Sequence, residues 1–312
     1  MLDSLSKEEI AVHFPAHCER LSEAPLLFYW WGEKNVGDLV TPYFLRRVCG
    51  VDDPELMRVP ESDLHVHPHR SAIRSIVDFL KGRTRTRASP RYSLSTGSVM
   101  RLCSQRAVVY GSGIRSRDQL VQPGICRIVR GPITRMQVLA SGGECPPIFG
   151  DPGLLMSRYY EPAYSSTKVQ LAIVPHFTEY ETVKDLYAND RRISIVDMGC
   201  GDIEHVIEEI VAAEAVVSSS LHGIIFANSY GVPVRWIKFS SQVHGDDTKY
   251  HDYFSSIGRK DEDFIPAIEF KRLPVEQMLE TIENYPLSID LDRIQDEMFF
   301  DSNGFRCSAR FE

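Results

Sequence analysis

The sequence predicts an α/β protein with two Rossmann-like domains that face a cleft. The chain has 312 residues, of which 43% are hydrophobic and 25% charged, and this suits a globular protein of two domains. Apolar runs of strand length alternate with glycine-containing loops and helical patterns, which indicates parallel sheets covered by helices. This alternation pauses at a polar stretch, residues 159–168, and then starts again. We therefore place the domains at residues 1–160 and 161–312.

The first domain opens with the apolar run 26–31, whose length and composition favour a central strand. Gly32 to Asp38 form a glycine-containing loop, and a helical pattern follows to Val48. Such a unit is typical of phosphate and nucleotide sites, although neither the dinucleotide fingerprint nor the P-loop lysine is present. The other elements expected in this domain are strands at 107–113, 126–131 and 148–149 and a helix at 132–140.

The second domain centres on residues 215–237, which predict a buried strand, a polar elbow, a helix and a second strand. The elbow, Ser218–Gly223, lies where open α/β sheets bind ligands, and the helix that starts near Leu221 would point its N–H groups at an anion. We also expect the C-terminal helices to pack back on the first domain, and the plan as a whole is GT-B-like. The other elements expected here are strands at 169–176 and 192–197 and helices at 202–213, 246–257, 273–282 and 291–299.

The composition limits the classes of partner molecule and the compartment that we expect for the protein. The net charge of −8 argues against nucleic acid. The seven cysteines form no Cys-x-x-Cys pair, so we expect small buried thiols in a reducing compartment. The N-terminus lacks the pattern of a signal peptide, and no apolar run approaches the ~20 residues that cross a bilayer. These features predict a cytoplasmic protein and leave peripheral contact with the inner face of the membrane open; the oligomeric state is not predicted.

Two segments have a plain and a functional interpretation. His65, His67 and His69 alternate as zinc ligands on one strand would, but Pro68 interrupts the pattern, and we favour a polar surface segment. Residues 81–91 carry five basic side chains, which fit a solvated loop or a patch for phosphates or an anionic membrane. No acidic pair has metal-binding spacing, and we expect no metal site.

Six segments between residues 26 and 258 resemble, in the same order, motifs of the polysaccharide pyruvyl transferase family, nearest to the bacterial exopolysaccharide ketal-pyruvyltransferases. These segments are 32–38 (G-x-x-N-x-G-D), 129–135 (V-R-G-P-x-T-R), 150–155 (G-D-P-x-L-L), 175–176 (P-H), 219–223 with 231–233 (S-x-x-L-H-G and G-x-P), and 249–258 (D-Y-F-x-S-x-G). One departure is clear: Ser220 stands where many members have Arg before Leu-His, although several relatives of this subgroup also carry Ser.

The resemblance implies transfer of a pyruvyl group from phosphoenolpyruvate to two hydroxyls of a sugar. The products would be a cyclic ketal, on a cell-surface or exopolysaccharide precursor, and phosphate. The partners would be phosphoenolpyruvate and a lipid-linked oligosaccharide, with no cofactor. Two alternatives stay open: a GT-B glycosyltransferase that uses a nucleotide sugar, because the elbow would also suit a diphosphate, and a non-catalytic scaffold of a polysaccharide assembly.

The chemistry assigns roles to the residues of these motifs. Protonation of the enol carbon suits His222, whose alternative role is structural hydrogen bonding. Asp38 would be the base for the sugar hydroxyl or, equally, the cap of the helix that begins near Val36. Arg130, Arg135 and Lys249 would bind the donor's carboxylate and phosphate, with ion pairs or solvated surface as their alternatives.

The remaining candidates surround these groups. We expect Asp151 to hold a turn at the domain junction. The residues expected beside the donor are Ser112, Gly113, Ser219, Ser220 and Gly223, and those beside the acceptor are Asn35, Gly37 and His176.

Overall fold

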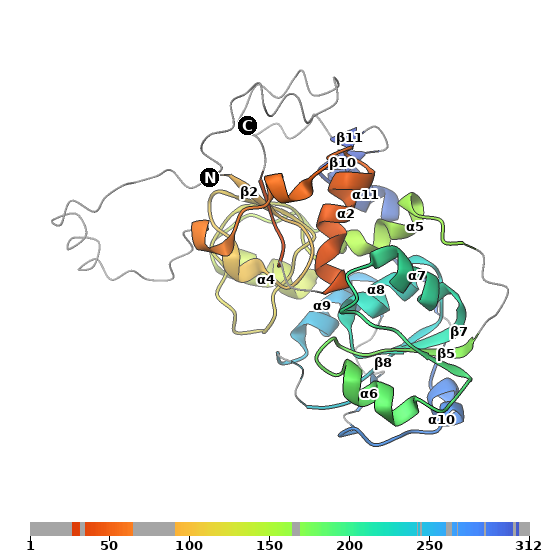
Figure 1. The fold of residues 1–312 in the computed structure, drawn as a ribbon. Helices are drawn as coiled ribbons and strands as arrows, with labels where there is room; N and C mark the ends of the chain where they lie inside the picture. Colours follow the sequence, from red (N-terminus) through yellow and green to blue (C-terminus); the bar gives the residue numbers. More distant parts are fainter. Residues whose placement is uncertain are drawn as a thin grey trace.

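The chain folds into two α/β units, each with its own parallel sheet (Figure 1). The computed structural model describes residues 27–31, 35–64, 91–163, 169–259, 264–301 and 304–305, except 242, 244, 267 and 284. The first sheet has the order β1-β2-β3-β4 and contains β1 (Leu27–Tyr29), β2 (Tyr92–Leu94), β3 (Ala107–Tyr110) and β4 (Ile125–Ile128). The second has the order β6-β5-β7-β8-β9 and contains β5 (Val169–Val174), β6 (Ile193–Ile195), β7 (Ala213–Ser218), β8 (Val234–Ile237) and β9 (Phe264–Ile265). Both sheets are compatible with Rossmann-like domains, whereas the GT-B arrangement stays a prediction.

Helices connect the strands, because parallel strands need a long crossover between them. The first unit contains η3 (Val36–Leu39), α2 (Val40–Arg47), η4 (Pro54–Met57), η5 (Glu61–Asp63), η6 (Met100–Leu102), α4 (Pro132–Ala140), η7 (Pro152–Leu155) and α5 (Met156–Tyr159). The second contains α6 (Tyr180–Tyr187), α7 (Ile203–Val211), α8 (Leu221–Ser229), α9 (Thr248–Ser256), α10 (Val275–Glu280) and α11 (Leu291–Glu297), followed by the hairpin strands β10 (Phe300–Asp301) and β11 (Gly304–Phe305).

The central strand and helix of the second unit are buried on all sides. The last four residues of β7 are buried, as an apolar strand covered on both faces should be. In α8, every residue from Leu221 to Asn228 is buried, because the helix contacts β7 and α7 on one side and η7 of the first unit on the other. This helix therefore fixes its N-terminal residues at the junction of the two units.

Most predicted elements are present, and three differences stand out. Strand β2 and helix α6 were not predicted, because β2 has only three residues and α6 directly follows a strand and turn without a strong start signal. The strand predicted at 148–149 is wrong: Phe149 makes a single bridge with Val129, and Gly150, with a φ of 152°, turns the chain into η7.

The two units share one hydrophobic core, which includes Phe28 of the first sheet and Val174 of the second. A backbone hydrogen bond joins them as well, from the N–H of Val36 to the carbonyl of Met198 at 2.8 Å. At the end of the chain, α11 contacts β4 and η7, and the ring of Phe300 lies 4.5 Å from that of Phe44. The boundary predicted at residue 160 stays a prediction, because no feature of the structure decides it.

Several predicted features lie outside the described residues: the three histidines at 65, 67 and 69 and the basic run 81–91. Within the described ranges, no helix is long and apolar enough to cross a membrane. The five cysteines placed there form no disulfide with one another, and four are buried. The expectation of a buried thiol is wrong for Cys200, which is exposed.

Candidate active site

The elbow between β7 and α8 is held in place by its own serines. The hydroxyl of Ser218 donates to the carbonyl of Val174 at 2.8 Å and accepts from the N–H of Ser220 at 3.0 Å. Ser220 is the N-cap of α8, with its Oγ 3.5 Å from the N–H of Gly223. A Cβ on Gly223 would lie 2.5 Å from Ser218 Oγ, so only glycine fits there. The position that the resemblance gives to an arginine thus serves here as a helix cap.

His222 lies in the first turn of α8 with only 8% of its surface exposed. Its ring packs against the first unit so closely that a Cβ on Gly37 would overlap with Nδ1. On another side, the ring of Phe226 lies 6.0 Å away. Burial and then the positive charges of Arg130 and Lys249 lower the pKa of His222 to about 3. The protein alone therefore keeps this imidazole neutral at pH 7.

The loop that faces His222 is the start of η3. Asn35 caps this helix, since its Oδ1 accepts from the N–H of Gly37 at 3.2 Å, and its Nδ2 donates to Asp38 Oδ2 at 2.8 Å. The capping role that we considered for Asp38 therefore belongs to Asn35. Asp38 is buried next to Gly97, and burial raises the pKa of its carboxyl to about 7. Such a group can exchange a proton near neutrality.

Asp151 has a second role besides the expected turn. Its Oδ1 accepts from the N–H of Gly153 at 2.9 Å and caps η7, as predicted. Its Oδ2 lies 3.8 Å from Nε2 of His222, and neither atom has a hydrogen-bond partner although both are buried. Burial raises the pKa of Asp151 to about 6. The sequence did not indicate this pairing because the two residues belong to different units, 71 positions apart.

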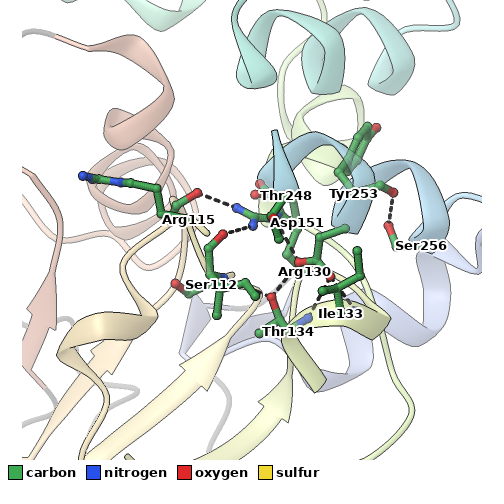
Figure 2. Close-up of polar contacts among 12 residues, drawn as sticks. Ser112, Arg115, Arg130, Ile133, Thr134, Asp151, Thr248, Tyr253 and Ser256 are labelled. Carbon is green, nitrogen blue, oxygen red and sulfur yellow. Dashed lines mark hydrogen bonds and ion pairs between the residues drawn. The ribbon is translucent and has the colours of Figure 1, made fainter. Parts of the chain in front are cut away.

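Arg130 is placed differently from our expectation. Its side chain is fully buried, and its Nη1 donates to Ser98 Oγ at 2.8 Å while Nη2 donates to the carbonyl of Ile114 (Figure 2). Its Nε lies 3.3 Å from Asp252 Oδ2, in an ion pair between the two units. The alternative of an ion pair therefore describes its position in this structure. Arg130 still acts on the site at a distance, because its charge lowers the pKa values of His222 and Asp151.

Asp252, on α9, completes this connection between the units. Its Oδ1 accepts from the N–H groups of Ile133 and Thr134, each at 2.9 Å, at the N-terminus of α4 (Figure 2). Its Oδ2 accepts from the hydroxyl of Thr134 at 2.6 Å. A carboxylate is favourable there because the free N–H groups of a helix start point at it. We call Ser98, Arg130, Thr134 and Asp252 the Arg130 cluster.

Lys249 supplies positive charge without a direct ion pair to any described residue. Its Nζ lies 5.0 Å from the ring of Tyr250, and within the described part of the chain it has no hydrogen-bond or ion-pair partner. Burial and the charges of Arg130 and Arg115 lower the pKa of Lys249 to about 8. Arg115 was not a candidate; its guanidinium points away from the Arg130 cluster, and its charge lowers the pKa values of Asp38 and Lys249 (Figure 2). We call Asp38, Asp151, His222 and Lys249 the His222 cluster.

Comparison with known proteins supports the resemblance noted in the sequence. Residues 101–241 match the family model described as polysaccharide pyruvyl transferase. A curated relative is an uncharacterised protein of Acanthamoeba polyphaga mimivirus, 31% identical over 173 residues. That match covers 52% of this chain and 58% of the relative, so the chain spans less than two thirds of its length. No solved structure matches the chain.

The region that is similar to the pyruvyl transferases contains part of the site. Arg130, Asp151 and the elbow with His222 lie inside residues 101–241. The loop with Asp38 and helix α9 with Lys249 lie outside it, and they reach the matched region only through the fold. The structure therefore connects the matched region to two further groups of the His222 cluster.

Several residues predicted beside the donor have partners within the protein, and their contact with the donor stays a prediction. Ser219 Oγ donates to the buried Glu179 at 2.6 Å and accepts from the N–H of His176 at 2.8 Å. Ser112 Oγ donates to the carbonyl of Gly97 at 2.9 Å, and a Cβ on Gly113 would overlap with the guanidinium of Arg130.

Arg135 and His176 also have partners within the protein. Arg135 Nε donates to the carbonyl of Cys145 at 3.0 Å within the first unit. The imidazole of His176 contacts Thr178 Oγ1 at 2.7 Å and stacks near Phe177, at the end of β5. In the described ranges, no group of three or more His, Cys, Asp or Glu side chains is placed to hold a metal ion.

Proposed function

We propose that the protein is a transferase that moves a pyruvyl group from phosphoenolpyruvate to two hydroxyls of a sugar, with a cyclic ketal and phosphate as products. The observation that supports this most strongly is the His222 cluster: His222 lies against the loop that carries Asp38, and the charge of Lys249 lowers the pKa of both groups. The similarity of residues 101–241 to polysaccharide pyruvyl transferases supports the same reaction class.

The proposed chemistry uses each group once. Asp38 accepts the proton of the first sugar hydroxyl, whose oxygen bonds to the central carbon of the donor, while His222 gives a proton to the methylene carbon. The electrons of the carbon–carbon double bond form the new C–H bond. The second hydroxyl then bonds to the same carbon as phosphate leaves with the electrons of its C–O bond, and the proton of that hydroxyl goes to the leaving phosphate. A carboxyl with a pKa of about 7 suits the base.

His222 must be protonated to act as the acid, and binding of the donor can raise its pKa. Phosphoenolpyruvate carries a carboxylate and a phosphate, and negative charge close to an imidazole raises its pKa. Lys249, and Arg115 at longer range, would bind these anionic groups in place of the arginine that Ser220 replaces. We further propose an oligosaccharide acceptor, lipid-linked at the inner face of a bacterial cytoplasmic membrane, for an exopolysaccharide.

A release assay tests the proposal. The purified protein is incubated with phosphoenolpyruvate and a glycan acceptor, and phosphate and the ketal are measured by colorimetry and mass spectrometry. We expect stoichiometric phosphate and ketal, both lost in His222→Gln. Release of a nucleoside diphosphate from a nucleotide sugar, with none of phosphate from phosphoenolpyruvate, would instead identify a glycosyltransferase.

A further inference from the structure

We propose that Asp151 is a positioning residue that holds Nε2 of His222, so that Nδ1 is the nitrogen that exchanges a proton with the substrate. The proton exchange with a substrate rests on the proposed function. The pairing of Asp151 with Nε2 of His222 does not. Asp151 Oδ2 and His222 Nε2 lie 3.8 Å apart, and both are buried without a hydrogen-bond partner.

Two buried polar atoms without partners are costly, because neither regains the hydrogen bonds that it makes to water in the unfolded chain. The separation is too short for a water molecule between them, and a shift of about 1 Å would bring them to hydrogen-bond distance. Catalytic hydrogen bonds are often long without substrate and shorten when it binds. A carboxylate can only accept, so the arrangement requires the proton of a neutral imidazole to be on Nε2.

The other nitrogen faces the first unit. A Cβ on Gly37 would overlap with Nδ1, which shows that this edge of the ring lies against the start of η3 beside Asp38. Glycine makes room for the ring at this point, and we expect a substrate bound near Asp38 to approach the ring along this edge. The loop with Asp38 then lies on the Nδ1 side of the His222 ring, and Asp151 lies on the Nε2 side.

The groups around the pair decide how its protons respond to pH. Arg130 and Lys249 bring positive charge from the first unit and from α9, and Asp38 brings a carboxyl from η3. Asp151 Oδ2 lies 3.8 Å from Nε2 and would offset the two cations when His222 becomes protonated. When Nδ1 then gives its proton to the methylene carbon, its bonding electrons stay on nitrogen and the ring returns to the neutral form.

The chain offers a matched control for the capping role of Asp151. Asp53 also precedes a proline and caps a short helix, since its Oδ1 accepts from the N–H of Glu55 at 3.1 Å in η4. Asp151→Asn and Asp53→Asn should both preserve the cap through the remaining carbonyl oxygen. Only Asp151→Asn places an NH₂ group, a donor, opposite Nε2 of His222 if its amide oxygen keeps the cap.

The test is ¹⁵N NMR of the histidine-labelled full chain, with the His222 signal assigned by its absence in His222→Gln. We expect the proton of His222 to be on Nε2 in the wild type and in Asp53→Asn, and on Nδ1 in Asp151→Asn. The near-UV circular dichroism spectra of the three proteins should match, which shows that all are folded. In the phosphate-release assay, Asp151→Asn should lower kcat by about tenfold or more and shift the acid limb of the pH profile, with little change in KM.

A wild-type His222 with its proton on Nδ1 would overturn the inference, and this measurement needs no variant to fold. An unchanged tautomer and pH profile in a folded Asp151→Asn would also overturn it. If the tautomer changes as expected but no pyruvyl transfer is found, the proposed function fails while the positioning of His222 stands.

Discussion

Two buried polar clusters lie next to each other at the junction of the units, and they differ in how many of their polar groups have hydrogen-bond or ion-pair partners. In the Arg130 cluster, Nη1 and Nη2 of the guanidinium donate hydrogen bonds, and both oxygens of Asp252 accept them at the start of α4. Nε of Arg130 has no hydrogen bond, but it forms the ion pair with Asp252. In the His222 cluster, Nε2 of His222 and Oδ2 of Asp151 have no hydrogen-bond partner among the described residues, and Lys249 contacts the ring of Tyr250 without an ion pair there. Satisfied groups stabilise a fold, whereas unsatisfied ones with shifted pKa values are typical of functional sites.

The contrast predicts that His222→Gln affects activity far more than stability. Loss of a general acid typically lowers the rate by 10²–10⁴-fold, and we expect such a decrease in kcat for phosphate release. The midpoint of urea unfolding should change little, because the ring makes no hydrogen bond through Nε2. His205→Gln, at an exposed position on α7, is the control and should keep full activity. Equal activities of the two variants would contradict the assignment.

Asp252→Ala should have the opposite profile, with stability affected first. It leaves Arg130 buried without its ion pair and removes the cap of α4, and breaking a buried pair in this way costs about 3–5 kcal/mol. Urea unfolding measures this change. Glu276→Ala removes an exposed ion pair with Arg192 and should leave the midpoint within error. If Asp252→Ala is as stable as this control, the Arg130 cluster does not hold the units together.

Lys249→Gln tests whether the unpaired cation binds the donor. A hydrogen bond to a charged group contributes about 1.5–3 kcal/mol, so we expect KM for phosphoenolpyruvate to rise roughly tenfold or more. Lys184→Gln is a matched control, because Lys184 also lies over a tyrosine ring, 5.3 Å from that of Tyr180, but on the exposed side of α6. A KM that changes equally in both variants would argue against a donor site at Lys249.

The smallest effect concerns the pH dependence of stability through Asp38. Its pKa is raised to about 7 from an ordinary value of 3.8, so between these pH values the folded state binds more protons than the unfolded state. Stability then falls as pH rises through this window. Asp38→Asn removes this loss of stability. The difference in free energy of unfolding, variant minus wild type, should therefore be larger at pH 8 than at pH 4.5 by about 1 kcal/mol or more. Urea unfolding at both pH values measures it, and a constant difference would mean an ordinary pKa.

The sequence predicted the fold well where its pattern was long and periodic. The alternating strands and helices of the second unit, including α7 and the elbow, are present because one face or both faces of each element are apolar. Strand β2 escaped prediction since three buried residues have no periodicity to detect.

The sequence predicted site residues that belong to a single motif. It did not predict contacts between residues that lie far apart in the chain. His222 and the loop 35–38 were expected on opposite units, and the structure places Gly37 against the ring. The burial of Arg130 and its pairing with Asp252, 122 positions away, depend on how the two sheets meet. The same is true of Asp151 beside His222, since only the turn was visible in the sequence.

The central claim is that His222 delivers a proton to the methylene carbon of phosphoenolpyruvate. The most direct measurement is mass spectrometry of the ketal formed in D₂O. The account predicts that each ketal methyl group carries one deuterium, taken from the exchanged imidazole, and that His222→Gln forms such a product only at the residual rate. A ketal methyl without deuterium, or the same labelled product at an undiminished rate from His222→Gln, would contradict it.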